Sequence, residues 1–317
     1  IILQQAQSKG PVGSNAQKIG DLYGSFMDEA RIETLGISPI KGDLEKVKSI
    51  KSRLDFIKLL GDEERRGLGG LFYTFVSTDH KDSTKNIVYL GQSGLSLPDE
   101  AYYREDEYEP IRQAFLLHVE KMFSLAQIED GSLKAKQVLE LETKIASSHW
   151  DQVKDRDAEL TYNKMDFDQL TKLAPTFNWP LWIEKSQTPA HVLSQVIVRQ
   201  PSYLEGLGKL LSEFDLDAWR SWMSWHVLSG ASPYLSTEFV NENFNFYGTT
   251  LSGTPQIRER WKRGISMVEG ALGEEIGKEY VKRHFPESSK LKMEKLVDNL
   301  LKAYEVSIKN LDWMTEE

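Results

Sequence analysis

The 317 residues include Lys+Arg 39 and Asp+Glu 48, which gives a formal net charge of −9, and 40% of them are hydrophobic. This is the composition of a globular protein, so a disordered or collagen-like chain is excluded. The acidic balance argues against a nucleic-acid groove, because phosphate binding requires clustered Lys and Arg. We therefore expect no nucleic acid among the partners.

The chain has no cysteine, which excludes disulfides, thiolate metal sites and a cysteine nucleophile. A reducing compartment fits this composition. No apolar stretch approaches the about 18 residues that a membrane helix needs. Residues 1–4 lack an initiator methionine and a signal-peptide pattern, and residues 313–317 stop on a helix-like pattern. We expect an interior segment of a longer protein.

Helical periodicity dominates the sequence. We expect helices at about residues 14–35, 43–60, 98–128, 132–149, 166–173, 188–197, 202–213 and 215–229. A long helix is expected over residues 254–285, with Pro255 in its first turn and Pro286 at its end. The helix after Pro286 should carry an apolar stripe made of Leu291, Leu296, Leu300, Tyr304 and Ile308.

One segment departs from the helical pattern. Residues 71–76 and 86–90 are rich in aromatic and β-branched side chains, and the polar stretch 77–83 separates them. This predicts a β-hairpin with a long connection. The expected fold is therefore mainly α, a multi-helix lobe with one small β-hairpin at about residues 71–92. The best candidate for a change of organisation is residues 229–233.

No complete active site is visible. The six histidines contain no pair spaced as in HExxH, and His118 is expected to be a boundary residue of its helix. Residues 67–70 are glycine-rich but precede a strand, so a flexible turn is favoured over a phosphate cradle. No GxSxG elbow occurs.

Two groups of residues leave alternatives open. Glu142 and His149, with the acids that follow at Asp151, Asp155 and Asp157, could bind a metal or move a proton. The favoured interpretation is a polar network at a helix end, with Arg156 neutralising the acids. A second group could line a ligand groove but at this spacing is more often core: Trp179, Trp182, Trp219, Trp222 and Trp225.

Five blocks, in order, resemble the neprilysin-type zinc metallopeptidases, a family that includes the bacterial oligopeptidase O. The most specific is residues 89–103, which read YLGQSGLSLPDEAYY. The other blocks are residues 18–28, residues 149–165 with an RD…YN-x-M pattern, residues 245–281 with NFYG, RWK and ALG, and residues 311–314. Together they span nearly all of residues 14–317.

The resemblance implies that the chain is the N-terminal, substrate-gating portion of a zinc-dependent metalloendopeptidase that cleaves oligopeptides. Residues 1–232 would form a helical lid lobe, and residues 233–317 would lead to the catalytic lobe, which is absent here. The family's HExxH, its third zinc ligand and its substrate-backbone motif do not occur. No catalytic, metal or substrate residue is therefore assigned, and zinc is expected only in the full-length enzyme.

The alternative is a free-standing helical module that binds peptides or a partner protein and has lost the catalytic half. Under the first hypothesis the partners are oligopeptides and the chain's own catalytic lobe, in a bacterial cytoplasm, since the chain has no cysteine. That hypothesis also predicts a large uncovered apolar face within residues 255–317. Its members would be Trp261, Ile265, Leu296, Leu300, Tyr304 and Ile308.

Overall fold

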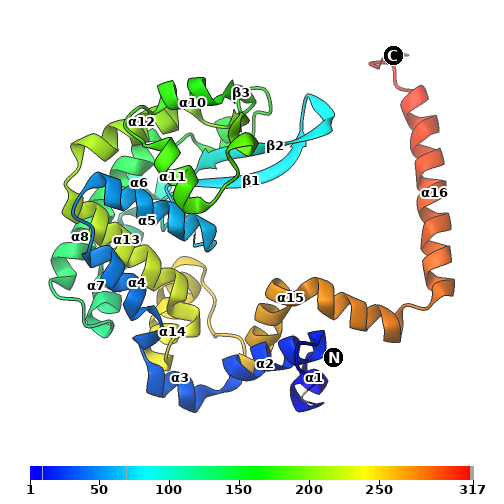
Figure 1. Ribbon diagram of the computed structural model, residues 1–317, viewed down its shortest axis with the longest axis horizontal. Helices are drawn as coiled ribbons and strands as arrows, with labels where there is room; N and C mark the ends of the chain where they lie inside the picture. Colours follow the sequence, from blue (N-terminus) through cyan, green and yellow to red (C-terminus); the bar gives the residue numbers. More distant parts are fainter. Residues whose placement is uncertain (9, 69, 315–317) are drawn as a thin grey trace. The chain divides into compact units, whose positions relative to one another are not determined.

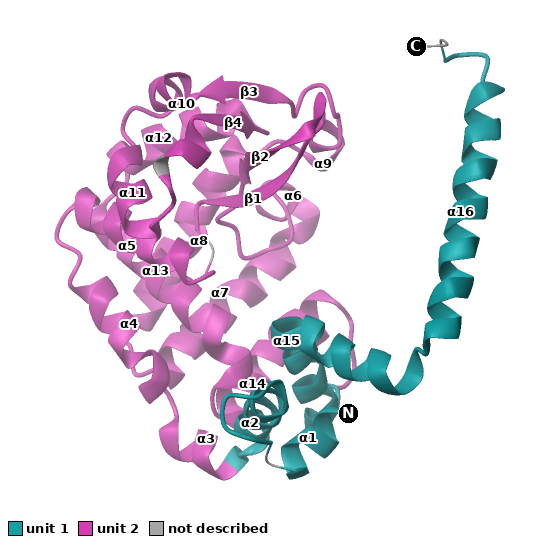
Figure 2. Cartoon of the chain, turned by 45° about the vertical axis from the view of Figure 1, so that its right-hand side comes forward, with its two compact units in different colours: residues 1–29, 258–317 teal, residues 30–257 magenta. Residues whose placement is uncertain are grey.

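The computed structural model describes residues 1–8, 10–68 and 70–314. They form two compact units, one of residues 30–257 and one that combines residues 1–29 with residues 258–317 (Figure 2). The fold is mainly α, as predicted, and each unit is described by itself.

The larger unit is built of helices around one small sheet (Figure 1). Its α-helices are α3 (Glu29–Leu35, at the unit's boundary), α4 (Ser38–Lys48), α5 (Arg53–Arg65), α6 (Ala101–Arg104), α7 (Glu109–Leu125), α8 (Gly131–Ser148), α9 (Gln152–Asp155), α10 (Phe167–Leu173), α11 (Trp179–Ser186), α12 (Pro201–Glu213), α13 (Leu216–Ala231) and α14 (Thr237–Asn243). Shorter turns are the 3₁₀ helices η1 (Asp106–Tyr108), η2 (Ala190–Leu193) and η3 (Ser232–Tyr234), and the π-helix η4 (Phe244–Leu251).

The sheet has four strands in the order β1-β2-β4-β3. The strands are β1 (Phe72–Asp79), β2 (Asp82–Gln92), β3 (Asn163–Asp166) and β4 (Gln195–Val198). β1 and β2 form the predicted hairpin, but the strands run through the polar stretch that was expected to be a long connection. Polar side chains there do not stop the ladder, since pairing uses backbone groups. β2 pairs with β4 in parallel, and β4 pairs with β3 in antiparallel orientation.

Five predicted helices were wrong in extent. The expected helix at 14–35 is α2 and α3, and the expected helix at 43–60 is α4 and α5. The expected helix at 188–197 is the short η2 followed by strand β4, because a brief apolar run does not distinguish a buried strand from a helix. The expected helix at 98–128 is interrupted after Arg104, and α7 begins anew with Pro110 in its first turn. The long helix expected from residue 254 begins at Arg260, after Gly253 adopts a φ of +66° at the end of η4.

The larger unit has two neighbouring hydrophobic cores. One packs the inner face of the sheet, including Phe72, Leu90 and Val198, against α5, α11, α12 and α13. The other lies between α7, α8, α13 and α14. The five tryptophans that could have lined a ligand groove are core residues, each with at most 3% of its surface exposed. The core prediction is therefore confirmed for Trp179, Trp182, Trp219, Trp222 and Trp225.

The smaller unit consists of α1 (Ile2–Ser8), α2 (Asn15–Met27), α15 (Arg260–His284) and α16 (Glu287–Lys309). Its core is small and joins Ile2, Ile19, Tyr23 and Val268. Gly264 allows α15 to approach α2, because a Cβ there would lie 2.9 Å from a ring carbon of Phe26.

Helix α16 has no buried residue. Its exposed apolar side chains are Leu291, Met293, Leu296, Val297, Leu300, Leu301, Tyr304, Val306 and Ile308. Trp261 on α15 is also exposed, whereas Ile265 is half-buried against the small core. Five of the six side chains predicted for an uncovered apolar face within residues 255–317 are therefore exposed, namely all except Ile265. No helix in the described ranges is long and apolar enough to cross a membrane.

Candidate functional site

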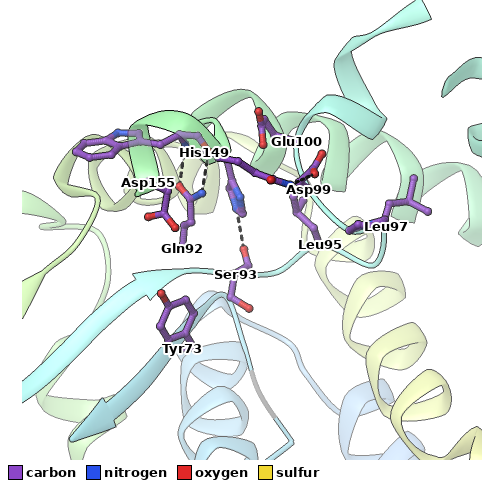
Figure 3. A pocket seen from close by; sticks show the side chains of 12 residues that line it. Tyr73, Gln92, Ser93, Leu95, Leu97, Asp99, Glu100, His149 and Asp155 are labelled. Carbon is purple, nitrogen blue, oxygen red and sulfur yellow. Dashed lines mark hydrogen bonds between the residues drawn. The ribbon is translucent and has the colours of Figure 1, made fainter. Parts of the chain in front are cut away.

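A cavity of about 280 Å³ with a mixed polar and apolar lining lies in the larger unit, where the segment after β2 meets the end of α8 (Figure 3). Strand β1 contributes Tyr73 to its wall, and the segment after β2 contributes Ser93 and Leu95. The acids of its lining are Asp99, Glu100 and Asp155. This cavity gathers part of the group that the sequence had singled out around His149.

His149 directly follows the last residue of α8, and its half-buried ring points toward the segment after β2. Its Nε2 donates to the Ser93 carbonyl at 3.0 Å (Figure 3). Its ring also meets the Tyr203 ring edge-on at 4.7 Å. Burial lowers the pKa of His149 to about 4, although the Ser93 carbonyl opposes this shift. The imidazole is therefore neutral at pH 7 and holds the segment after β2 against α8.

The neighbouring acids mostly cap backbone groups. Asp151 accepts from Lys154 N at 2.8 Å at the start of α9, and Asp157 accepts from Glu159 N at 2.9 Å. Asp155 forms an ion pair with Arg199 at 3.3 Å. The polar-network interpretation agrees with these bonds, but the cation on Asp155 is Arg199 instead of the expected Arg156.

Glu142 belongs to a different network from His149. Its carboxylate is fully buried and accepts from Tyr103 Oη at 2.5 Å, Ser96 Oγ at 2.7 Å and His226 Nε2 at 3.0 Å. Ser96 N adds a fourth bond at 3.0 Å. Burial and the adjacent carboxylate raise the pKa of Tyr103 well above its usual value. Four donors meet the needs of a buried charge, so Glu142 anchors the segment 93–103.

The sequence did not connect Ser96, Tyr103 or His226 to Glu142. The signal that could have found two of them was present, since Ser96 and Tyr103 belong to the 89–103 block that carries the resemblance. His226 is on α13, and only the packing of α13 against α8 brings it to the carboxylate.

His118 is not the boundary residue that was predicted. It is 3% exposed, its Nδ1 lies 2.8 Å from Glu242 Oε1, and its ring stacks on Phe246 at 4.8 Å. Helix α14 and η4 cover that side of α7, which the sequence of α7 alone does not reveal. Gly67 forms a turn with a φ of +74°, but the glycine stretch 67–70 lies partly outside the described residues.

Within residues 1–8, 10–68 and 70–314, no group of three or more His, Asp or Glu side chains could hold a metal ion. The acids and histidines discussed above are held by donors of the fold instead. Zinc does not fit the side chains that the structure describes, and the geometry offers structural networks and one acidic cavity.

Comparison with known proteins gives the family. A family model described as "Peptidase family M13" matches residues 1–317. The chain belongs to peptidase family M13. Human endothelin-converting enzyme 1 is 29% identical over 328 residues, which cover 98% of this chain and 42% of that protein. An endothelin-converting enzyme homolog of Locusta migratoria is 27% identical over 338 residues, 100% of this chain and 46% of that protein.

Two solved structures agree with the fold. The zinc metalloprotease Zmp1 of Mycobacterium tuberculosis, in complex with an inhibitor, has a TM-score of 0.91 at 40% identity over 99% of this chain and 48% of its own. PepO from Lactobacillus rhamnosis has a TM-score of 0.81 at 19% identity over 99% of this chain and 50% of its own, and supports the fold alone. The chain thus spans about half the length of these relatives.

Proposed function

We propose that the chain is the substrate-gating, N-terminal portion of a zinc-dependent metalloendopeptidase that cleaves oligopeptides. Membership of the M13 family supports the enzyme class, and Zmp1 is itself a zinc metalloprotease. The described residues contain no cluster of side chains that could hold a metal ion. Zinc and the residues that hold it would therefore belong to the rest of the enzyme. When bound there, zinc would act as a Lewis acid on the peptide carbonyl.

The observation that carries this proposal is the uncovered face of α16. A helix with a one-sided apolar stripe needs a partner, and contiguous apolar patches of this kind are rare on monomers. Leu296 and Leu300 are 49% and 48% exposed, and Tyr304 is 62% exposed. The catalytic lobe of the same enzyme is the partner that the family supplies. The alternative, a free-standing module, would need a separate partner protein to cover the same stripe.

In this proposal residues 1–232 gate access and residues 233–317 lead into the catalytic lobe. Compactness divides the chain at other points, between residues 29 and 30 and between residues 257 and 258. The change of role would therefore begin inside the larger unit, near η3 and α14.

Location in the cytoplasm is part of the same proposal and is supported by the absence of cysteine from the sequence. Cell fractionation with an antibody to the chain tests the compartment.

The enzymatic part is tested with the protein encoded by the complete reading frame. We expect it to cleave quenched fluorescent oligopeptides, to lose activity on chelation and to regain it with Zn²⁺. The 317-residue chain alone should be inactive. Absence of hydrolysis by the zinc-loaded complete protein would refute the proposed function.

The docking role of α16 is tested by a matched pair of variants in the complete protein. Leu300→Asp places a charge in the stripe, and Asn299→Asp places the same charge beside it. We expect Leu300→Asp to reduce the free energy of unfolding by about 2–4 kcal/mol, since it buries an unpaired charge. Asn299→Asp should stay within about 0.5 kcal/mol of the parent. Equal effects of the two variants would contradict the docking role.

A further inference from the structure

Strand β1 is an edge strand, and the hydrogen bonds of its neighbour fix the direction of its backbone groups. Arg199 N donates to Leu90 O at 2.8 Å, so Leu90 presents its backbone groups to β4. The direction of these backbone groups alternates along a strand, so the N–H and C=O of Tyr89 point toward β1. Its partner Phe75 points its own N–H and C=O back toward β2. The residues on either side of Phe75 therefore point their N–H and C=O groups away from the sheet.

Those residues are Thr74 and Val76. In the described chain, no backbone hydrogen bond outside the β1–β2 ladder uses either of them. Val76 is 64% exposed, and the irregularity in the ladder comes only at Thr78 and Asp79. Edge strands are usually protected by proline, lysine or a bulge, and residues 72–77 have none of these. The open side of β1 is thus suited to pair with an extended peptide.

An aromatic shelf lies next to this edge. Tyr73 and Phe75 are 38% and 40% exposed, and their rings stack at 5.9 Å. Phe75 stacks in turn on the buried Tyr89 at 4.9 Å. The Tyr73 ring lies over Gly91, where a Cβ would overlap it. Apolar side chains of a peptide paired with β1 would find contact area on these rings.

The shelf continues into the acidic cavity, because Tyr73 belongs to both (Figure 3). The lining contains three carboxylates and neither Lys nor Arg. Asp155 has Arg199 as its partner, and Asp99 accepts from Gln152. Glu100 is 6% exposed and forms no ion pair within the described residues, since the nearby Arg104 donates to the carbonyls of Ala146 and His149 instead. Burial raises the pKa of Glu100, and the charge of Arg104 opposes this shift without forming an ion pair with the carboxylate.

We propose that the open edge of β1 and the Glu100 cavity form a peptide-binding site, in which an extended peptide pairs with β1 and places an ammonium or guanidinium group beside Glu100. The site rests on the proposed function in one respect, namely that the protein meets oligopeptides. It adds a substrate class, peptides with a cationic group next to apolar residues. Backbone pairing would supply affinity, and the shelf and cavity would supply specificity.

The charge preference is tested by fluorescence anisotropy with the 317-residue chain. The probes are acetylated, labelled peptides of about eight residues, the length of β1, that carry one lysine among leucine and threonine, or glutamate in its place. We expect the lysine peptide to bind about tenfold more tightly, with a preference that weakens at high salt. A third probe with a free N-terminus and no lysine distinguishes a terminal ammonium from a side chain.

A matched pair of variants assigns this preference to Glu100. Glu100→Gln should reduce the lysine preference to about threefold or less, while leaving stability unchanged or higher because a buried unpaired charge is removed. Glu205→Gln, at an exposed position on α12, should leave the preference unchanged. Equal affinities of the parent chain for lysine and glutamate peptides would overturn the proposal.

Strand addition is tested from both sides of the pair. Val76→Pro removes an outward N–H at an edge position, where a strand tolerates proline. It should reduce the binding affinity of the lysine and glutamate peptides about tenfold. A lysine peptide with alternate backbone N-methyl groups should bind the unaltered chain about tenfold more weakly, which keeps the test independent of folding. Unchanged affinity for the methylated peptide would also overturn the proposal. If the complete enzyme hydrolyses peptides but the lysine peptide does not bind as described, only the proposed binding site is refuted. If the lysine peptide binds but the complete enzyme does not hydrolyse peptides, only the proposed function is refuted.

Discussion

Helices α13 and α16 are both rich in large apolar side chains, and they lie in opposite environments. In α13 these side chains are buried, among them Trp219, Trp222 and Trp225. In α16 none is buried. The apolar residues of α13 occupy most of its circumference, which requires neighbours on several sides. Those of α16 form one stripe flanked by Lys and Glu, which suits a single partner. The pattern around a helix therefore indicates how many faces are to be covered.

The largest expected effect compares the two helices directly. Trp222→Ala should reduce the free energy of unfolding of the 317-residue chain by about 3–5 kcal/mol, because it opens a cavity in the core and removes the bond to Gly94 O. Tyr304→Ala on α16 should change it by no more than about 0.5 kcal/mol. Urea denaturation followed by far-UV circular dichroism measures both. Similar losses in the two variants would mean that α16 is buried in solution.

A second comparison uses glycines in close and in open packing. Gly61 lets α5 approach α11, since a Cβ there would lie 2.7 Å from Trp182 O. Gly61→Ala should cost about 1–3 kcal/mol through overpacking. A Cβ added to Gly277 on α15 would meet no neighbouring atom within 4 Å, so Gly277→Ala should stabilise by about 0.5–1 kcal/mol. Thermal unfolding of the pair checks the signs, and two changes of the same sign would contradict this contrast.

A third comparison is of pH dependence. His149 has its pKa lowered to about 4 by burial, so between about pH 6.5 and pH 4 the unfolded chain binds more protons than the folded chain. His149 therefore makes stability fall as the pH falls through this window, by at most about 1.4 kcal/mol per pH unit. The slope also reflects the groups that face the ring, since Arg104 lowers this pKa and Asp155 raises it.

His149→Gln keeps a donor for the Ser93 carbonyl and removes the titration, so the slope between pH 6.5 and pH 4.5 should become smaller. His284→Gln, at an exposed position on α15, is the matched control for loss of an imidazole. Urea midpoints measured at half-unit pH steps give the slopes. Identical slopes in the parent and in His149→Gln would contradict the assignment.

The smallest expected effect concerns α16 in the 317-residue chain without the rest of the enzyme. Leu300→Asp should leave the stability of the 317-residue chain within about 0.5 kcal/mol, because its side chain is already exposed. The same variant should raise the monomer fraction in sedimentation velocity, since the stripe loses apolar area. A large loss of stability in the isolated chain would show that the stripe is covered without the rest of the enzyme.

The sequence predicted local secondary structure better than tertiary contacts between segments that are distant in the chain. The hairpin and most helices followed from side-chain period, and the tryptophans were correctly placed in the core. Strands β3 and β4 were missed because each has only four residues, and β4 becomes a strand by pairing with β2 far away in the chain. Similarly, the Glu142 network depends on His226 from another helix, and the cavity depends on Tyr73 meeting the end of α8.

The strand order β1-β2-β4-β3 has a consequence for synthesis on the ribosome. The hairpin and β3 leave the ribosome before β4, which is a central strand of the finished sheet and the last of the four in the chain. At about 5–20 residues per second, the nascent chain carries β2 with an unpaired second edge for on the order of ten seconds. During that interval Val88 and Leu90 lack the strand that will lie beside them. A nascent chain in this state is open to mispairing, and a chaperone that binds extended apolar segments would find its target there.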